Sequence, residues 1–196
     1  MTSNNSKIIV LDRDGVVNED SENYIRSPTE WEPITGSIQA MAELTANGFD
    51  IVIATNQSGL ARGYFSEYDL AKIHTKLLSL VEASGGFITG IFYCPHAPSA
   101  GCNCRKPKTG LLERAEAELK ISLRGKFFVG DSMNDMQAAE AFEMRPILVR
   151  TGKGGRTEKE LCGALRGTIP VFDNLSSATK WIISSGSNMR VSEAPS

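Results

Sequence analysis

The sequence lacks a hydrophobic run long enough to span a bilayer, and it lacks an excess of charge of either sign. Its 21 Lys and Arg residues are matched by 23 Asp and Glu residues, which gives a net charge of −2. A net charge this small and negative does not attract a protein to nucleic acid or to an anionic membrane. No stretch of the sequence resembles a basic binding stripe. Residues 1–7 are polar and too short for a secretory signal. We therefore expect a cytoplasmic protein without nucleic-acid or membrane partners.

What the chain does contain is ordinary for one globular unit. A hydrophobic share of 41% over 196 residues suffices for one sizeable core but not comfortably for two. We expect a single domain over residues 1–186 and a disordered tail over 187–196, where small and polar residues dominate. The sequence has neither an internal repeat nor a low-complexity segment.

Short apolar runs alternate with longer amphipathic ones. Runs at 7–11, 49–55, 88–94, 126–130, 146–150 and 169–172 have the near-continuous apolar composition of parallel strands covered on both faces. Helical patterns occupy 37–46, 66–81, 111–119, 133–142, 158–165 and 175–184, and Ser66 with Asp69 resembles a capping box. This alternation predicts an α/β fold, with a doubly wound, mostly parallel, Rossmann-like sheet, helices on both faces and no separate cap domain.

Two long irregular segments interrupt the alternation, at 15–33 and 95–107. Loops of this length inside a compact domain tend to be functional. Both follow the carboxyl ends of predicted strands, where ligands bind in open α/β sheets. We therefore expect the functional site at this edge, with the two loops around its entrance.

Residues able to carry chemistry collect at the same strand ends. Asp12 and Asp14 follow the first strand, Thr55 ends the second, and Asp131 and Asp135 follow the fourth. Each has an ordinary alternative, such as a polar turn or, for Asp131, a helix cap. Arg105 and Lys106 precede a helix, where a solvated basic pair is equally ordinary. Because all converge on one side of the sheet, one site for a phosphate and a divalent cation explains them better than four coincidences.

The set Asp12-x-Asp14, Thr55, Lys106 and Gly130-Asp131-x3-Asp135 resembles the four motifs of the haloacid dehalogenase superfamily, in order and spacing, over residues 8–150. The resemblance implies hydrolysis of a phosphate monoester through a phospho-aspartate on Asp12. Asp14 is then the general acid and base, and Thr55 and Lys106 neutralise the phosphoryl oxygens. Mg²⁺ is implied between Asp12, Asp131 and the backbone carbonyl of Asp14. Asp135 supports Lys106, the metal's water shell or the helix start.

A second metal site is indicated by a separate motif, Cys-x-His-x5-Cys-x-Cys. Its residues Cys94, His96, Cys102 and Cys104 lie within eleven positions and match a closed, structural Cys₃His zinc site. The alternative is a set of free thiols in a loop. Cys104 stands two residues before Lys106, so zinc here anchors the loop that carries the lysine. Cys162 is left over and is expected on the core face of a helix.

The zinc loop running into Arg-Lys-Pro resembles the branch of the superfamily that contains heptose-bisphosphate and histidinol phosphatases. The residues around Asp12 and Thr55 are more similar to those of the heptose enzymes. This resemblance implies that the substrate is a sugar bisphosphate and that the product feeds surface-polysaccharide synthesis. The residues expected on the substrate are Asn18, Asp20, Asn56, Arg62 and Arg105, although Asp20 and Arg62 suit solvated loop positions equally well. The glycine-rich run 151–156 could bind phosphate, but such a run is more often a flexible loop, and we expect His74 to be a surface or core-edge residue of a helix.

Three other functions stay open from the sequence. A histidinol-phosphate phosphatase shares every catalytic residue and differs only in its loops. An end-processing phosphatase for nucleic acid is disfavoured by the acidic balance. A zinc-stabilised binding module, with structural aspartates, predicts no turnover at all. We expect a monomer whose partner is a small phosphorylated sugar.

Overall fold

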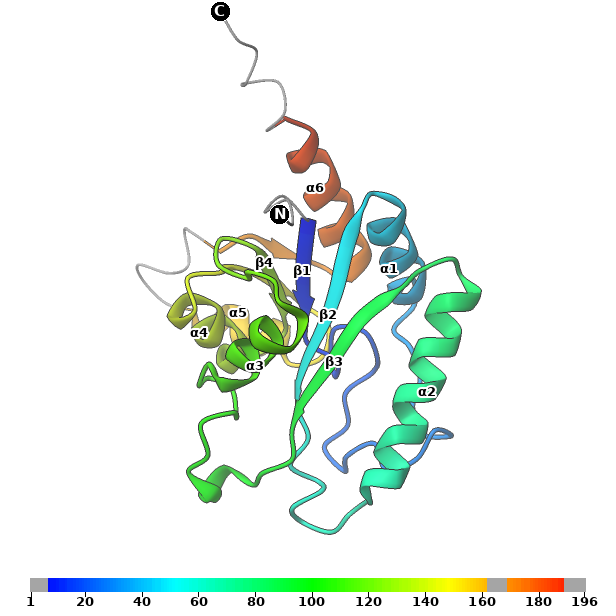
Figure 1. The fold of residues 1–196 in the computed structure, drawn as a ribbon, viewed down its shortest axis with the longest axis vertical. Helices are drawn as coiled ribbons and strands as arrows, with labels where there is room; N and C mark the ends of the chain where they lie inside the picture. Colours follow the sequence, from blue (N-terminus) through cyan, green and yellow to red (C-terminus); the bar gives the residue numbers. More distant parts are fainter. Residues whose placement is uncertain (1–6, 162–168, 189–196) are drawn as a thin grey trace, which may run out of the picture.

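Six parallel strands form one sheet in the computed structural model, which describes residues 7–161 and 169–188 (Figure 1). The strands are β1 (Lys7–Leu11), β2 (Phe49–Asn56), β3 (Ile88–Cys94), β4 (Phe127–Gly130), β5 (Arg145–Val149) and β6 (Val171–Phe172). Their order is β3-β2-β1-β4-β5-β6, and every neighbouring pair is parallel. The winding reverses direction between β1 and β4, and in open α/β sheets a ligand crevice forms at that point.

Helices cover both faces of the sheet. They are α1 (Ser37–Ala46), α2 (Glu67–Ala83), α3 (Gly110–Leu119), α4 (Met133–Ala141), α5 (Gly154–Glu160) and α6 (Leu175–Asn188), with a 3₁₀ turn η1 (Pro98–Ala100) in the loop after β3. Helices α1, α2 and α6 lie on one face, and α3 and α4 lie on the other (Figure 1). The predicted doubly wound Rossmann-like architecture is therefore confirmed, and the described residues form no separate cap domain.

The sequence of β1 explains why both faces are covered. Successive side chains of a strand point to opposite faces. Ile9 and Leu11 accordingly enter the core beneath α1, α2 and α6, whereas Ile8 and Val10 enter the core beneath α3 and α4. All four are at most 2% exposed. After Lys7 the strand has no polar residue on either face, as expected for a central strand, and this places the end of β1 at the middle of the carboxyl edge.

Local sequence signals also set where the helices begin. At α2, the Ser66 hydroxyl accepts from the Asp69 amide at 3.2 Å, and the Asp69 carboxylate accepts from the Ser66 amide at 3.0 Å. This reciprocal pair is the predicted capping box. A second one, formed by Ser132 and Asp135, starts α4 directly after β4. The cap of α4 therefore uses a residue that the sequence also marks as a site residue.

Most predicted boundaries agree within one or two residues, but two segments differ. α5 begins at Gly154, inside the run 151–156 that we expected to be a flexible loop, and ends at Glu160 rather than extending to 165. Thr157 fixes this helix because its hydroxyl donates to the backbone carbonyl of Asp131 at 2.9 Å. α6 continues to Asn188, so the first two residues of the predicted tail are helical. Cys162, the rest of the predicted helix and 189–196 lie outside the described residues.

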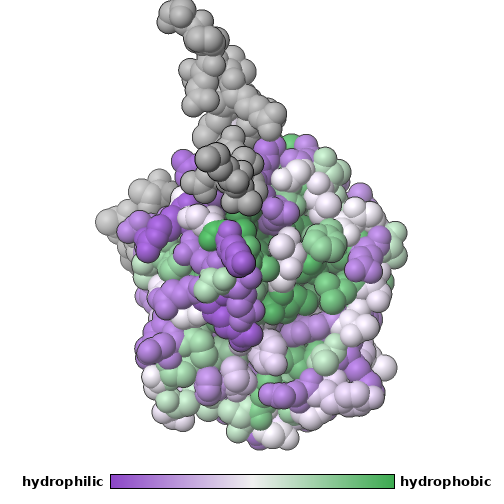
Figure 2. Space-filling model, in the orientation of Figure 1, coloured by the Kyte–Doolittle hydropathy of each residue, from purple (hydrophilic) through white to green (hydrophobic). Residues whose placement is uncertain are grey.

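The visible surface mixes hydrophilic and hydrophobic side chains without a division into two halves (Figure 2). Few large apolar side chains of the described residues are exposed, among them Tyr68 and Phe87. In the ranges 7–161 and 169–188, none of the helices has the length and apolar character needed to cross a membrane.

The core beneath α1 supplies a test of this packing. Leu44→Ala removes a side chain that is fully buried in the first core, and we expect the free energy of unfolding to fall by about 2–5 kcal/mol. Urea unfolding followed by circular dichroism measures this change. Gln39→Ala, on the exposed side of the same helix, is the matched control and should stay within about 0.5 kcal/mol of the wild type. Equal effects of the two substitutions would contradict the packing described here.

Candidate active site

The first residue of the site continues directly from β1. The Asp12 amide donates to the carbonyl of Val129 in β4 at 2.9 Å, so its backbone is still held by the sheet. The side chain is 8% exposed and lines a pocket, and its Oδ1 accepts from the Arg13 amide at 2.7 Å. Among the described residues no group donates to Oδ2 of Asp12. That oxygen is therefore free to act on a ligand in the pocket.

The carboxylate of Asp14 is held by donors on several sides. Nη2 of Arg13 lies 2.8 Å from Oδ1 and 3.0 Å from Oδ2. Asn18 donates to Oδ1 at 2.9 Å, and Gln57 donates to Oδ2 at 2.7 Å. Burial raises the pKa of Asp14, but the Arg13 guanidinium and these hydrogen bonds outweigh it and hold the pKa below its ordinary value. Asp14 is thus an oriented anion in the resting site.

Lys106 is delivered to the other side of Asp12 by the loop before α3. Its side chain is 2% exposed, and its Nζ lies 2.9 Å from Oδ1 of Asp12, 2.6 Å from Oδ1 of Asp135 and 2.7 Å from the Ala54 carbonyl. Three acceptors satisfy the three N–H groups of the ammonium. Burial lowers the pKa of Lys106, but the two carboxylates outweigh it and raise the pKa above its ordinary value. The lysine is therefore a fixed positive charge.

The same loop is held to β2 by a reciprocal pair of hydrogen bonds. The Lys106 amide donates to Oδ1 of Asn56, and Nδ2 of Asn56 donates to the Lys106 carbonyl, both at 3.1 Å. The sequence suggested Asn56 as a substrate-binding residue, and in the structure its side chain also holds the backbone of Lys106 in place. Both the nitrogen and the oxygen of its side-chain amide take part in this pair.

Three carboxylates at this edge, those of Asp12, Asp131 and Asp135, lie with one oxygen each within 4.8 Å of one another. Burial first, and then the neighbouring carboxylates, raise the pKa of Asp12 to about 7 and that of Asp131 to about 8. Asp135 is already engaged, because Lys106 lies at its Oδ1 and the Ser132 hydroxyl donates to its Oδ2 at 2.6 Å. Asp12 and Asp131 are left as a buried pair of like charges, which a divalent cation would neutralise.

Two glycines let the backbone approach the Asp131 carboxylate closely. Gly15 and Gly152 both have positive φ, at 83° and 57°. A Cβ atom at either position would collide with the Asp131 carboxylate. Oδ2 of Asp131 accepts from the Lys153 amide at 2.7 Å, so the turn after β5 also holds this carboxylate. The donor set and the glycine cradle fit a small hard cation such as Mg²⁺.

The pocket between these groups has a volume of about 470 Å³. Asp12, Asp14, Thr55 and Asp131 line its floor, and residues of the loop after β1 form part of its wall. Thr55 is 1% exposed, and its hydroxyl accepts from Gln57 at 2.9 Å. The structure therefore brings the two first-strand aspartates, the threonine, the lysine and Asp131 together, as the sequence predicted for one site.

The cysteine motif also comes together as a cluster. The Sγ atoms of Cys94, Cys102 and Cys104 are 3.3–3.7 Å apart, and Nδ1 of His96 lies 3.5 Å from Cys94 Sγ and 3.2 Å from Cys104 Sγ. These sulfur separations exceed a disulfide bond of about 2.05 Å. A tetrahedral ion with Zn–S bonds of about 2.3 Å places its sulfurs about 3.8 Å apart. The four side chains therefore fit zinc, with no coordination position left for catalysis.

The remaining residues proposed for the substrate have different surroundings. Arg105 and Asp20 line the pocket, and Asp20 pairs with Nζ of Lys153 at 2.9 Å. Asn18 is fully buried and uses its amide on Asp14 and on the Glu19 carbonyl. The guanidinium of Arg62 lies over the Tyr24 ring, 5.9 Å from its centroid, at the rim.

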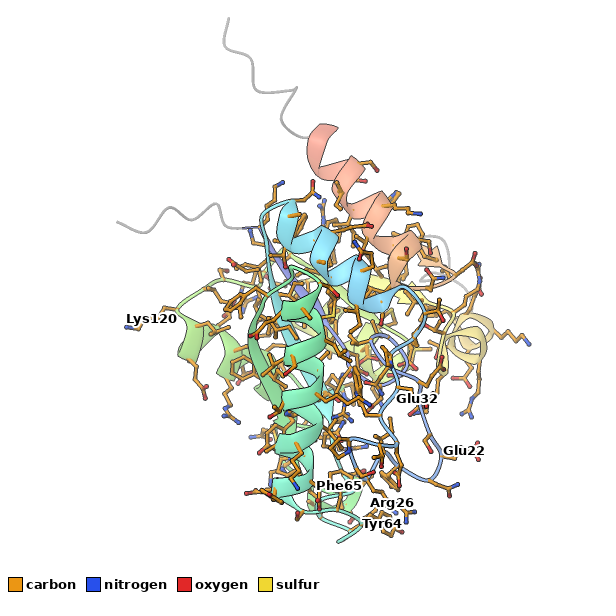
Figure 3. The ribbon with its side chains drawn as sticks, turned by 90° about the vertical axis from the view of Figure 1, so that its right-hand side faces the viewer. Glu22, Arg26, Glu32, Tyr64, Phe65 and Lys120 are labelled. Carbon is orange, nitrogen blue, oxygen red and sulfur yellow. The ribbon has the colours of Figure 1, made fainter. Side chains whose placement is uncertain are left out.

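The rim joins the two loops that flank the entrance. The Tyr24 and Tyr64 rings lie 4.9 Å apart, and Arg26 lies over Tyr64 at 5.4 Å. Arg26, Tyr64 and Phe65 gather at the end of the molecule beyond the carboxyl edge, and Glu22 lies on the same loop as Arg26 (Figure 3). These aromatic and cation–π contacts hold the loop after β1 against the loop after β2.

The sequence interpretation did not assign several residues that the structure places at or behind the pocket. Gln57 and Arg13 contact Asp14, and His74 lies behind Arg13. Lys153 lines the pocket from the turn after β5. For Lys153 a signal was present, because it follows the carboxyl end of a parallel strand just as Asp131 does. The glycines around it suggested a flexible loop instead.

Comparison with known proteins supports this geometry. The HAD-hydrolase-like family profile matches residues 103–178. The D-glycero-beta-D-manno-heptose-1,7-bisphosphate 7-phosphatase of Pseudomonas putida is 45% identical over 177 residues, which cover 90% of this chain and 99% of that protein. The enzyme of the same name from Neisseria meningitidis is 42% identical, covering 90% of this chain and 95% of its own length.

A solved structure extends the likeness to three dimensions. The crystal structure of D,D-heptose 1,7-bisphosphate phosphatase from B. bronchiseptica, complexed with magnesium and phosphate, superposes with a TM-score of 0.86 at 42% identity. The match covers 91% of this chain and 99% of that chain. Because identity, coverage and the carboxylate site all agree, the chain belongs to the HAD-like hydrolase family that contains these phosphatases.

Proposed function

We propose that this chain is a Mg²⁺-dependent phosphatase that removes the 7-phosphate of D-glycero-D-manno-heptose 1,7-bisphosphate, a step in heptose supply for lipopolysaccharide. The observation that carries the chemistry is the pairing of two differently held carboxylates, Asp12 and Asp14, in one pocket with a buried lysine. The substrate follows from relatives 40–49% identical that carry this name.

Asp12 is the nucleophile in this proposal. Its Oδ1 is occupied by the Arg13 amide and by Lys106, so Oδ2 attacks phosphorus in line with the sugar oxygen that leaves. The phosphoryl group is then bonded to Asp12. Lys106 and the Thr55 hydroxyl neutralise charge on its equatorial oxygens, and both are fixed before the substrate arrives.

Asp14 handles the protons. It gives a proton to the leaving sugar oxygen and later takes one from the water that hydrolyses the phospho-aspartate. Its resting form is the anion, so it must take up a proton from solvent when the substrate binds. A phosphate dianion brought beside Asp14 adds negative charge and raises the pKa of that carboxyl. Substrate binding thereby favours the acid form that the first step requires.

The residues that would hold Mg²⁺ are Asp12, Asp131 and the backbone carbonyl of Asp14. When bound, the ion neutralises the phosphate and the nucleophile so that two anions can approach each other. Asp135 does not belong to this set in our proposal, since Lys106 and Ser132 occupy its oxygens. Its role is to orient Lys106.

A bisphosphate also needs a second cationic contact. Arg105 and Lys153 both line the pocket, on loops from opposite halves of the sheet. Arg105 can offer its planar fork to the second phosphate or to the sugar. Asp20, paired with Lys153, and Asn56 are the polar groups nearest the sugar hydroxyls in this proposal, and Arg62 acts from the rim.

Zinc held by Cys94, His96, Cys102 and Cys104 has a structural role. The Cys104 ligand lies two residues before Lys106, so the metal limits the motion of the loop that delivers the lysine. We further propose that residues 1–186 act as a single domain and as a monomer in the cytoplasm. The partner is then the small sugar phosphate alone, without nucleic acid or membrane.

The proposed function is tested by phosphate release in the presence of Mg²⁺, with heptose 1,7-bisphosphate and histidinol phosphate at equal concentrations. We expect strong preference for the bisphosphate, since only this substrate uses the cations at both ends of the pocket. Asp12→Asn is the control for contaminating phosphatase and should retain the fold and less than about 1% of wild-type turnover. Preference for histidinol phosphate would reject the substrate, and an active Asp12→Asn would reject the nucleophile.

The zinc site is tested without reference to activity. Wild-type protein should contain about one zinc per chain by atomic emission, and Cys102→Ser should lose it and unfold at a lower temperature. Cys162→Ser is the matched control, because this cysteine lies outside the sequence motif, and it should keep the metal. A zinc-free wild type with unchanged stability would contradict the proposed site.

The glycine cradle gives a test of the magnesium site. Gly152→Ala pushes a Cβ atom against the Asp131 carboxylate, so the Mg²⁺ concentration for half-maximal activity should rise about tenfold or more. Gly155→Ala is the control, since a Cβ there would lie 3.8 Å from the backbone oxygen of Arg150, an ordinary contact distance. An unchanged Mg²⁺ requirement in the Gly152 variant would argue against Asp131 as a ligand.

A further inference from the structure

Behind Asp14 lies a polar chain that the reaction, as described above, does not use. Arg13 is one of the largest fully buried side chains, with 1% of its surface exposed. One edge of its guanidinium, Nε and Nη2, donates to Asp14. The other nitrogen, Nη1, lies 3.3 Å from Nε2 of His74 on α2. These hydrogen-bonded groups therefore connect α2, on one face of the sheet, to a carboxylate in the pocket.

The chemistry of this contact fixes the state of the histidine. A guanidinium has donors only, so Nε2 of His74 must be the acceptor and carry no proton. The imidazole is accordingly neutral, with its proton on Nδ1. Burial, and then the charge of Arg13, lower the pKa of His74 to about 3, which agrees with this assignment. The Tyr93 ring of β3 packs beside the imidazole, with centroids 5.9 Å apart.

We propose that His74 is a positioning residue for phosphate-ester hydrolysis: by accepting from Nη1 of Arg13, it turns the guanidinium so that its other edge holds the Asp14 carboxylate. A buried guanidinium whose Nη1 has lost its acceptor would rotate toward another one. Asp14 would then be held by Asn18 and Gln57 alone. This inference rests on the proposed role of Asp14 as acid and base.

The role predicts a particular pattern of losses. Protonation of the leaving oxygen matters for a sugar alcohol, which is a poor leaving group, and hardly matters for p-nitrophenolate. Replacing His74 should therefore slow the sugar substrate selectively. A role of His74 in stability alone would lower the rates of both substrates by the same factor.

The experiment compares His74→Leu, which removes the acceptor, with His74→Gln, whose amide oxygen can replace Nε2. We expect His74→Leu to lower kcat/KM on heptose 1,7-bisphosphate about tenfold and to lower kcat/KM on p-nitrophenyl phosphate less than about twofold. The ratio kcat/KM reports formation of the phospho-aspartate and not its later hydrolysis, in which Asp14 acts as base for either substrate. His74→Gln should restore most of the loss. Thr75→Val, on the exposed side of α2, is the matched control and should resemble wild type. Asp14→Asn supplies the reference pattern, with a larger loss of the same kind.

Several results would overturn the inference. On the sugar substrate, an unchanged kcat/KM in the Leu variant would reject the role of His74, and so would a Gln variant whose kcat/KM is as low as that of the Leu variant. Equal losses on both substrates would reject it as well. If wild type hydrolyses neither substrate, the proposed function fails together with this inference. If wild type is active but Asp14→Asn is impaired equally on both substrates, the phosphatase function stands and only the acid role, with His74 behind it, fails.

Discussion

The structure depends on one electrostatic constraint, which is that several carboxylates must share a small buried volume at the carboxyl edge of the sheet. Asp12, Asp131 and Asp135 have oxygens within 4.8 Å of one another. Like charges at this distance and burial raise each other's proton affinity unless cations are present. Lys106 supplies one such cation, and we propose that Mg²⁺ beside Asp12 and Asp131 supplies another. In this proposal the zinc loop, the Asn56 pair and the glycine cradle keep these two positive charges in place.

The fold could be predicted well from the sequence because its signals are local. Apolar runs of strand length alternate with helical patterns, and parallel order follows from connection rules rather than from any single residue. The part that failed, the start of α5, depends on a contact distant in sequence. The Thr157 hydroxyl caps the Asp131 carbonyl across a separation of 26 residues. The glycines of this segment indicate a loop, and local composition cannot indicate a hydrogen bond to a residue so far away in the sequence.

The candidate site shows the same division. Residues at strand ends, such as Asp12, Thr55 and Asp131, could be predicted because the edge of a parallel sheet brings them together by topology alone. Asn18 illustrates what topology does not give. It stands in a pocket-forming loop, yet its side chain is fully buried and turned onto Asp14. His74 is a similar case, since its partner Arg13 is 61 residues away and on another element.

The two carboxylates that we propose as nucleophile and proton carrier differ in their neighbours. Asp12 lies among other carboxylates, and burial together with their charge raises its pKa to about 7 despite the neighbouring Lys106. Asp14 lies among donors, which hold its pKa below the ordinary value. In the proposed mechanism, a bound cation would favour the anionic form of the nucleophile, whereas the protein's own donors orient the proton carrier. When a phosphate dianion enters, it brings negative charge toward Asp14 at the same time as it brings phosphorus toward Asp12. One binding event therefore sets both groups for the first step, and departure of the alcohol returns Asp14 to the anionic form that the second step needs.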